Sequence, residues 1–396
     1  MNEKPDLSEG SKIRRFILTA LLYLSLLLQT GFSQQKTNQK PDIQFDIERG
    51  LRIQAADSSA SLRIGLRFQE QFSARFETDE DRSDLEFQVR RFRLIFAGHF
   101  LSDRLTYFFM PSFDRGKASL ELMRVQWKLS ENSWIYGGQI NLPGTREFLQ
   151  NSGTLQFVDR STSNRLFRLG FDTGLGYKQK FFPGQTALIG IATITNGEGQ
   201  NQRAARGGLS YTGRLEFYPF GEFNSYIGSD FERSRKPQLV IAGAYNYNQD
   251  AVRTRSHLGN FLTDASANII TGFLESSARY RGFSFHTGYA VRSANNNLLN
   301  DGNPQNYISE GKAFYLESGY LLPQNWEIVS LFERIYPDKQ LREIMSGERS
   351  FLIGINKYII KHRLKFQTDF KFDSIIVSSA ENQDIIVFRT QFQIEF

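Results

Sequence analysis

The strongest constraint on the fold is a two-residue period of apolar and charged side chains that recurs from residue 61 to the end of the chain. In Ser61–Phe72 (SLRIGLRFQEQF), leucine, isoleucine and phenylalanine alternate with arginine, glycine and glutamine. The stretches His362–Phe372 and Phe388–Phe396 repeat the pattern. Successive side chains of a β-strand point to opposite faces of the sheet, so each stretch has one apolar and one charged face. The period predicts an all-β chain.

About sixteen such segments can be counted, each close to the ~10 residues that a tilted membrane-spanning strand needs. Short connections, such as Arg281-Gly282, alternate along the chain with long polar ones, such as 142–167. This alternation in loop length is typical of transmembrane β-barrels. The connection near 221–236 is an exception, since it is long where a short turn is expected. The predicted strands are 61–72, 85–99, 103–113, 119–129, 133–141, 168–182, 185–195, 208–220, 237–248, 269–281, 282–291, 312–321, 325–335, 348–358, 361–372 and 385–396.

The composition fits a barrel with one face in lipid and the other in water. The mean hydropathy of −0.41 is too polar for a bundle of membrane-spanning helices, yet 14% of the residues are aromatic. An open sheet edge in lipid would leave amides unpaired, so we expect the strands to close into a transmembrane antiparallel barrel. A soluble β-sandwich, lectin or solenoid would show the same alternation, but three features favour the membrane. These are an export signal, a terminal Phe396 that resembles the C-terminal signal of outer-membrane barrels, and aromatics near strand ends that predict interfacial girdles (Trp127, Trp134, Tyr136, Tyr218, Trp326, Tyr336 and Tyr358).

The N-terminus has the pattern of a cleaved signal peptide. Basic residues at 12–15 precede the short apolar run Phe16–Leu28, and small residues Gly31 and Ser33 occupy the −3 and −1 positions if cleavage follows Ser33. The alternative is an uncleaved signal anchor, for which the run is short. The predicted organisation is a signal peptide with a polar lead-in at 1–33, a short periplasmic segment at 34–60 and a transmembrane β-barrel at 61–396.

Several classes of function are disfavoured by the sequence. The net charge is only +6 and the charges are interspersed, so no nucleic-acid-binding patch is predicted. The chain has no cysteine, and its four histidines show no metal-ligand spacing. A barrel phospholipase would need a Ser–His couple on one strand face; His286 and Ser284 share a face, but a histidine of the barrel wall is the simpler interpretation. We therefore predict no enzyme, no metal and no cofactor.

Four stretches carry more specific motifs, in a fixed order along the chain. One is the arginine-rich QVRRFRLIFAGHF at 88–100, and another is GQINLPGTREFLQNSGTLQFVDR at 138–160. With Glu48–Gln69 and the C-terminal FRTQFQIEF, these stretches resemble the phosphate-selective porin O/P family of outer-membrane channels. The resemblance implies a 16-stranded barrel in the outer membrane of a Gram-negative bacterium, often trimeric, through which small anions diffuse.

Candidate pore-lining residues come from the alternation and from the resemblance. If the apolar face meets lipid, the opposite face of the strands puts arginines into the lumen, where rings of positive charge favour anions. A phase change near Arg90 predicts a β-bulge that re-aims Arg91 and Arg93. The resemblance further implies that the long segment after the fifth strand folds into the pore as a constriction. The candidates are Arg63, Arg67, Arg91, Arg93 and Arg124 from the strands, and Arg146, Arg160, Arg165 and Arg168 from that segment.

The predicted function is that of an outer-membrane porin for passive diffusion of small hydrophilic solutes, with a preference for anions and among them phosphate. A blander interpretation is a weakly selective wall whose inward arginines only pair with inward carboxylates, and pores for other solutes, including larger organic ones, stay open. A different class is a barrel that serves as surface anchor or partner of an envelope complex. The predicted partners are outer-membrane lipid, small anions such as phosphate and, from the resemblance, two further copies in a homotrimer.

Overall fold

A computed structural model describes residues 40–48, 50–77, 82–182, 184–204, 208–299, 303, 305–376 and 382–396. The predicted signal peptide, residues 1–33, lies outside this described part of the chain. Within it, none of the helices has the length and apolar character that crossing a bilayer requires.

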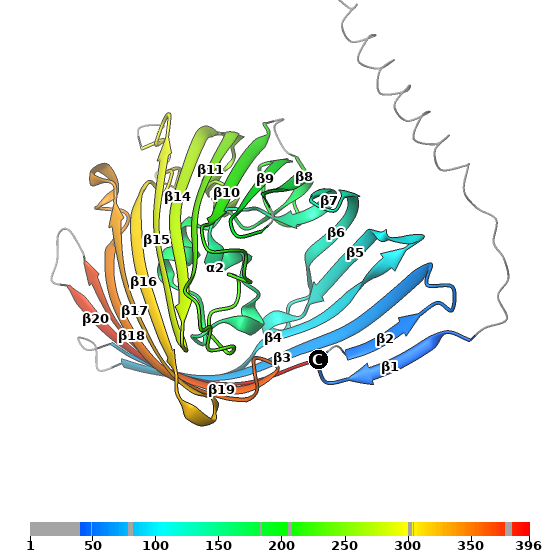
Figure 1. Ribbon diagram of the computed structural model, residues 1–396. Coiled ribbons are helices and arrows are strands. Elements are labelled where there is room, and N and C mark those ends of the chain that lie inside the picture. The colour runs from blue at the N-terminus through cyan, green and yellow to red at the C-terminus, as the bar shows by residue number, and fades with distance from the viewer. Residues whose placement is uncertain are drawn as a thin grey trace, which may run out of the picture. The chain divides into compact units, whose positions relative to one another are not determined.

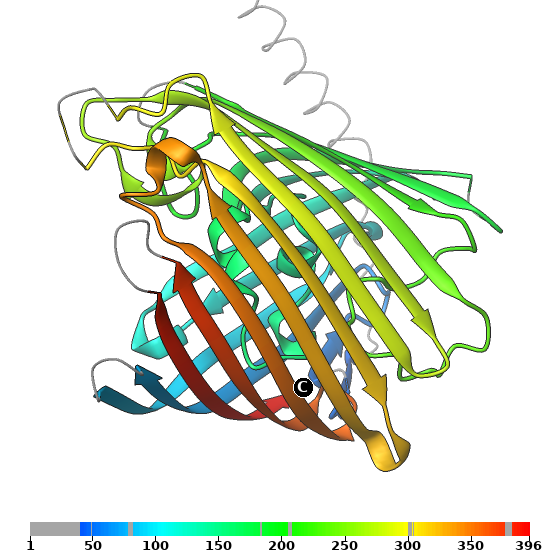
Figure 2. The ribbon, with the colours of Figure 1, turned by 90° about the vertical axis from the view of Figure 1, so that its left-hand side faces the viewer.

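Sixteen antiparallel strands close into a barrel (Figures 1 and 2). Each strand pairs with the barrel strand before it in the chain, and β20 returns to pair with β3. Every predicted segment coincides with one observed strand, with ends that differ by a few residues. The barrel strands are β3 (Ala60–Glu77), β4 (Arg82–Phe100), β5 (Ser102–Ser112), β6 (Ser119–Ser130), β7 (Ser133–Asn141), β8 (Phe171–Phe181), β9 (Ala187–Thr195), β10 (Ser210–Tyr218), β11 (Gln238–Ala251), β14 (Ala267–Tyr280), β15 (Phe283–Ala294), β16 (Gly311–Leu321), β17 (Trp326–Pro337), β18 (Gly347–Ile360), β19 (Leu364–Ile376) and β20 (Gln383–Glu395).

The two ends of the barrel differ in the length of their connections, and we call them the short-turn end and the long-loop end. At the short-turn end, strands are joined by tight turns such as Arg281-Gly282, both with positive φ. The exception predicted from sequence is present, because residues 219–237 join β10 and β11 at this end. The long-loop end carries connections such as 295–310, and its connection 252–266 holds the small hairpin of β12 (Arg253–Arg255) and β13 (Leu258–Phe261).

A hairpin of β1 (Asp42–Asp46) and β2 (Gly50–Gln54) completes the seam between the first and last barrel strands. Phe396 exchanges two backbone hydrogen bonds of 3.0 Å with Leu66 of β3. Beyond that point β2 replaces β20 as the partner of β3. Gly50 starts β2 at φ 75°, and a Cβ there would lie 2.4 Å from the carbonyl oxygen of Ile64. Only glycine therefore fits where β2 continues the line of β20.

The predicted β-bulge is present in β4. The register between β3 and β4 shifts by one residue, which leaves Arg90 as the extra residue of β4. Between the shift and the long-loop end of β4, Phe87 is 77% exposed on the outer face. After the shift, Arg91 and Arg93 are 3% and 8% exposed and face the lumen. The bulge thus turns two adjacent arginines inward, as expected from the phase change.

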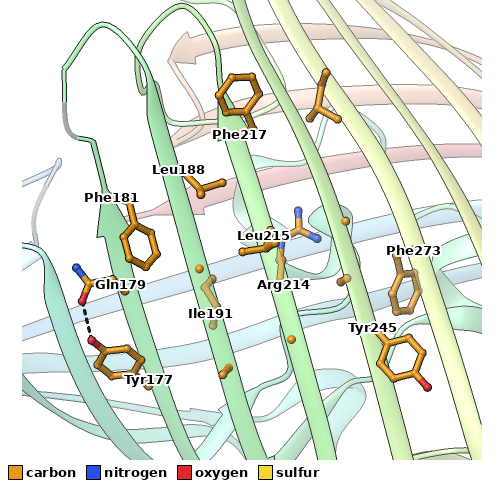
Figure 3. Close-up of a pocket in the computed structure, with 16 residues that line it drawn as sticks. Tyr177, Gln179, Phe181, Leu188, Ile191, Arg214, Leu215, Phe217, Tyr245 and Phe273 are labelled. Atoms are coloured by element: carbon orange, nitrogen blue, oxygen red, sulfur yellow. Dashed lines mark hydrogen bonds between the residues drawn. The ribbon is translucent and has the colours of Figure 1, made fainter.

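The outer face of the barrel is apolar, as a lipid-facing surface requires. On β8–β11 it holds a shallow groove of about 910 Å³ with glycines at its floor and tyrosine and phenylalanine at its edges (Figure 3). Of the predicted girdle aromatics, Trp127, Trp326 and Tyr336 are exposed on this face. Tyr218 and Tyr358 are instead buried, at 2% and 1%, because the strand alternation turns them into the lumen.

Candidate functional site

The segment 142–170 between β7 and β8, which we call the inner loop, lies inside the barrel. It contains the helices α2 (Arg146–Leu149) and α3 (Thr162–Phe167) and a 3-10 turn, η2 (Ser152–Thr154). Each helix starts at a hydroxyl side chain: Thr145 accepts a hydrogen bond from the amide of Phe148, and Ser161 accepts one from the amide of Asn164. Most residues of the inner loop are buried, although the loop connects two strands. The expectation that this segment folds into the lumen is therefore met.

Carboxylates of the barrel wall hold the inner loop in place. The amide N–H of Arg146 donates a bifurcated hydrogen bond to the two carboxylate oxygens of Glu275 of β14, at 2.9 and 2.8 Å. Glu333 of β17 accepts from the amides of Thr162 and Ser163 and from the Ser163 hydroxyl, at 2.7 to 3.0 Å. These amides belong to the first turns of short helices, where negative charge is favourable. The loop is thus fixed to the wall opposite its own strands.

A cavity of about 960 Å³ opens above the inner loop on the long-loop side, and we call it the vestibule. Among the described residues that line it, eleven are Arg or Lys and five are Asp or Glu, so positive charge predominates. The basic residues come from β3, β4, β19, β20, the turn at 114–116 and the inner loop. They are Arg67, Arg75, Arg90, Arg91, Arg93, Arg115, Arg160, Arg165, Arg168, Lys371 and Arg389.

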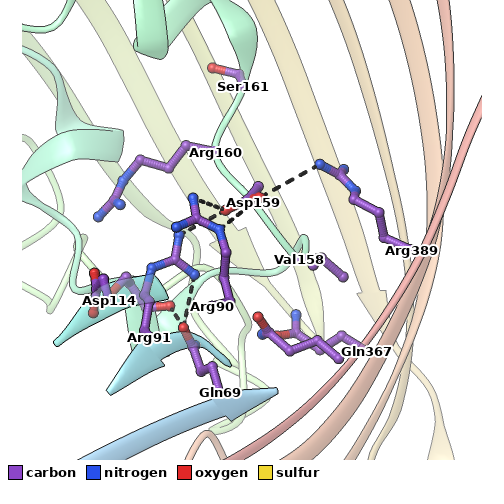
Figure 4. A network of polar contacts seen from close by, with 12 residues as sticks. Gln69, Arg90, Arg91, Asp114, Val158, Asp159, Arg160, Ser161, Gln367 and Arg389 are labelled. Carbon is purple, nitrogen blue, oxygen red and sulfur yellow. Dashed lines mark hydrogen bonds and ion pairs between the residues drawn. The ribbon is translucent and has the colours of Figure 1, made fainter. Parts of the chain in front are cut away.

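Asp159 of the inner loop is the acidic centre of this cluster (Figure 4). Its carboxylate pairs with Arg90 at 2.9 Å, with Arg91 at 2.8 Å and more loosely with Arg389 at 4.0 Å. Burial would raise the pKa of Asp159, but the three guanidinium groups outweigh it and hold this pKa below its usual range. Asp159 therefore stays ionised and compensates only part of the positive charge around it.

Among the described residues, no carboxylate forms an ion pair with Arg160 or Arg168 of the inner loop, although Glu121 and Glu147 act on both from further away. Arg160 donates to the carbonyl oxygens of Glu147 and Gln150. Burial, and then the charge of Arg168, lowers the pKa of Arg160 to about 9. Both guanidinium groups lie against the ring of Phe148, with their carbons 5.8 and 5.0 Å from its centre. An anion in the vestibule would compensate more of the positive charge of these two arginines.

In the described part of the chain, two arginine side chains that line the vestibule have buried nitrogens without a hydrogen-bond partner. Within the described residues, Nε of Arg168 and one terminal nitrogen of Arg67 are buried and have no hydrogen-bond partner. The other nitrogens of Arg67 bind Glu395 at 2.6 Å and Ser152 at 2.9 Å. Buried donors without partners are costly, and protein atoms cover these two nitrogens, so a solute reaches them only if neighbouring side chains move.

The nine predicted pore-lining arginines separate into three groups. Six of them line the vestibule: Arg67, Arg91, Arg93, Arg160, Arg165 and Arg168. Arg63 and Arg124 face the lumen nearer the short-turn end, as the alternation of β3 and β6 requires. Arg146 is 2% exposed, and its guanidinium binds Gln150, the carbonyl of Ser225 and His286, so it serves the packing of the inner loop.

Five basic residues of the vestibule are not among the nine candidates. One of them, Arg389, lies on the charged face that the alternation of residues 388–396 predicts, and the other four were missed. Arg90 was treated only as the site of the bulge, and Arg115 lies in a connection. Lys371 lies on the charged face of the predicted strand 361–372 but was not named as a candidate, and Arg75 lies three residues beyond the predicted strand 61–72. Sequence alternation thus carried the signal for Arg75 and Lys371, but not for the side chain of a bulge residue or of a turn.

The histidines take part in packing. His286 bonds to the Ser277 hydroxyl at 2.7 Å rather than to Ser284, whose hydroxyl binds Gln156. His286 is fully buried between the wall and the inner loop. Across the described residues no three His, Asp or Glu side chains group as metal ligands would.

Neutralising Asp159 gives the first prediction. In Asp159→Asn the three arginines lose their shared counter-charge, so the anion-to-cation permeability ratio of the pore is expected to rise by roughly threefold. The measurement is the reversal potential in a salt gradient across a planar bilayer. Glu343→Gln, an exposed change of the same charge in the connection after β17, should leave the ratio unchanged; an unaltered ratio in Asp159→Asn would contradict the assignment of this cluster to the pore.

A closed antiparallel barrel of sixteen strands with a loop folded into its lumen is the fold of outer-membrane porins. The chain is similar to the anion-selective porin from Comamonas acidovorans (TM-score 0.55, 8% identity, covering 85% of this chain and 100% of that one). It is also similar to OprB of Pseudomonas putida (TM-score 0.55, 10% identity, covering 85% of this chain and 94% of that one). A third similar structure is OmpF of Salmonella typhi, solved with daunomycin (TM-score 0.55, 10% identity, covering 86% of this chain and 99% of that one). No protein-family model and no curated protein matches the sequence. The fold agrees with the predicted location in the outer membrane of a Gram-negative bacterium.

Proposed function

We propose that this chain is a porin through which small hydrophilic solutes cross the outer membrane by passive diffusion, with a preference for anions and, among them, for oxyanions such as phosphate. The observation that carries the proposal is the vestibule, where eleven basic side chains face five acidic ones above a loop that narrows the lumen. In a narrow opening with walls of low dielectric constant, fixed charge is poorly screened and attracts counter-ions.

The preference for oxyanions has further support in the type of cation. The floor of the vestibule is built from arginine, whose planar fork can give two parallel hydrogen bonds to a phosphate or carboxylate. The sequence resemblance to the phosphate-selective porin O/P family points to the same solute, and a solved neighbour of the same fold is named as anion-selective.

The organisation that we propose follows from the same function. Residues 1–33 would direct export, 34–60 would lie on the periplasmic side and 61–396 would span the membrane, with the short-turn end toward the periplasm. The apolar outer face would contact outer-membrane lipid. A homotrimer is proposed from the sequence resemblance; a solved neighbour, OmpT of Vibrio cholerae, is described as a trimer (TM-score 0.52, 9% identity).

The test is a zero-current potential measurement on the purified, refolded protein in a planar bilayer with a KCl gradient. We expect the potential to have the sign of an anion-selective pore, and phosphate at low concentration to reduce the chloride current. A large unselective current would keep the porin and reject the oxyanion preference. A folded barrel without any current would reject the pore and favour a surface anchor or a partner of another envelope complex.

A further inference from the structure

Residues 222–234, which we call the second inner segment, enter the lumen from the short-turn end. They belong to the connection between β10 and β11 that is long where short turns prevail. A connection that hangs into solvent has exposed side chains, but Ser225, Ser229 and Asp230 are only 1 to 2% exposed. The segment is therefore part of the barrel interior.

Contacts with the wall and with the inner loop hold the second inner segment in place. The Ser229 hydroxyl lies 2.9 Å from the Glu327 carboxylate of β17 and 3.0 Å from the Tyr358 hydroxyl of β18. Asp230 accepts a hydrogen bond of 2.8 Å from the amide of Gly282, in the turn between β14 and β15. The carbonyl oxygen of Ser225 accepts one of 3.0 Å from Arg146 of the inner loop. The two inner segments thus form one continuous lining.

The lining divides the periplasmic half of the lumen into a covered and an open part. Wall residues of β14, β15 and β17 behind it, such as Ser277, His286 and Glu327, are 0% exposed. On β5, β6 and β8 the corresponding inward residues, including Thr106, Arg124 and Lys178, keep contact with the open lumen. The strands β14, β15 and β17 lie on the opposite side of the barrel from β5, β6 and β8. The passage is therefore displaced toward β3–β8.

The open part of the wall is basic, whereas the covered part holds buried carboxylates together with buried cations such as Arg214 and Arg279. Glu327 accepts hydrogen bonds from Ser229, Gln156 and Tyr358, with no cation among these donors. Glu216 of β10 is 2% exposed and accepts a hydrogen bond from the Tyr226 hydroxyl of the second inner segment. Neutral hydroxyl and amide groups thus cap Glu327, whereas Glu216 is held by Tyr226 and by an ion pair of 2.7 Å with Arg214. Both carboxylates would otherwise face a permeating ion.

We propose that the second inner segment is a specificity-determining element of the pore: it narrows the periplasmic half of the lumen and hides the carboxylates of Glu216 and Glu327 from the passage. This inference rests on the proposed function as a pore. It adds that anion preference arises from covering negative charge on one side as well as from exposing positive charge on the other.

The test replaces residues 222–234 with Gly-Ser-Gly in the full chain and compares single-channel conductance and reversal potential with the wild type. We expect conductance to rise at least about twofold, because the lumen widens, and anion selectivity to fall, because two carboxylates become exposed. The replaced segment itself has more acidic than basic residues, so its loss alone would shift selectivity the other way. Adding Glu216→Gln and Glu327→Gln to the shortened chain should restore selectivity while conductance stays high.

A second measurement avoids dependence on the folding of the shortened chain. Because the chain has no cysteine, a single introduced cysteine is the only target of a charged thiol reagent. Thr106→Cys on the open side should react from the periplasmic side and reduce the current, whereas Ser277→Cys on the covered side should not. Equal reaction of both cysteines, or an unchanged conductance in a folded shortened chain, would overturn the inference while leaving an anion-selective pore intact. Failure of the wild type to conduct would instead remove the proposed function.

Discussion

Replacing Arg160 and Arg168 together with glutamine is expected to remove most of the anion preference of the pore. Both guanidinium groups line the vestibule, and within the described residues neither has an ion pair like those of Asp159 with Arg90 and Arg91. A unit charge about 7 Å from a permeating ion, at an effective dielectric constant of about 20 to 40, changes the energy of that ion by roughly 1 to 2 kcal/mol. Loss of two such charges should lower the anion-to-cation permeability ratio by about tenfold, allowing for screening by salt.

The double substitution with lysine separates charge from geometry. Lysine keeps the positive charge but lacks the planar fork that binds an oxyanion at two points. In Arg160→Lys with Arg168→Lys we expect the reversal potential to stay close to that of the wild type and the block by phosphate to weaken. Arg342→Gln, an exposed arginine in the connection after β17, is the matched control for the loss of charge. A block by phosphate that is unchanged in the lysine variant would limit the pore to general anion selectivity.

Removal of Glu333 is expected to have the largest effect on stability. Its carboxylate is 0% exposed and receives three hydrogen bonds from the start of α3. In Glu333→Ala two amides and a hydroxyl lose their acceptor inside the barrel, which should lower the free energy of unfolding by about 3 kcal/mol. The inner loop, held less firmly, should also make the single-channel current larger and noisier.

The measurement for Glu333 is urea-induced unfolding in lipid vesicles, followed by the fluorescence of the three tryptophans. Glu333→Gln, which keeps one acceptor oxygen and loses the charge, should fall between the wild type and Glu333→Ala. The exposed Glu343→Ala is the control and should unfold like the wild type. A Glu333→Ala chain as stable as the wild type would show that the inner loop is held mainly by its other contacts.

The barrel strands could be predicted because each has one face in lipid. Apolar side chains predominate on that face, so the barrel strands show a two-residue period of apolar and polar residues. Even the bulge at Arg90 was visible, because an extra residue shifts the phase of the period. The same rule misplaced Tyr218 and Tyr358 in an outer girdle, since proximity to a strand end says nothing about the face on which a residue lies.

The interior could be predicted only in part. The inner loop was expected from the resemblance to a porin family, and not from its own residue pattern. Residues 222–234 are polar and irregular, which is also the composition of a loop in water, and their length was the sole sign that they differ. The packing role of Arg146 was equally hidden, because its partners Ser225 and His286 are brought to it by the closed barrel. A periodic pattern within one strand cannot predict contacts between residues that are far apart in the sequence.

The seam of the barrel has a consequence for the order of assembly. Among the described barrel strands, every adjacency joins chain neighbours except that of β3 with β20, where Arg67 and Glu395 are 328 positions apart. Bringing such distant strands together costs about 5 kcal/mol of chain entropy, whereas each hairpin forms over a much shorter separation. Hairpins can therefore accumulate one after another while the ring is still open, and the ring closes last. The β1–β2 hairpin lies beside β3 along the line that β20 takes, so it can provide the incoming C-terminal strand with an edge already in register.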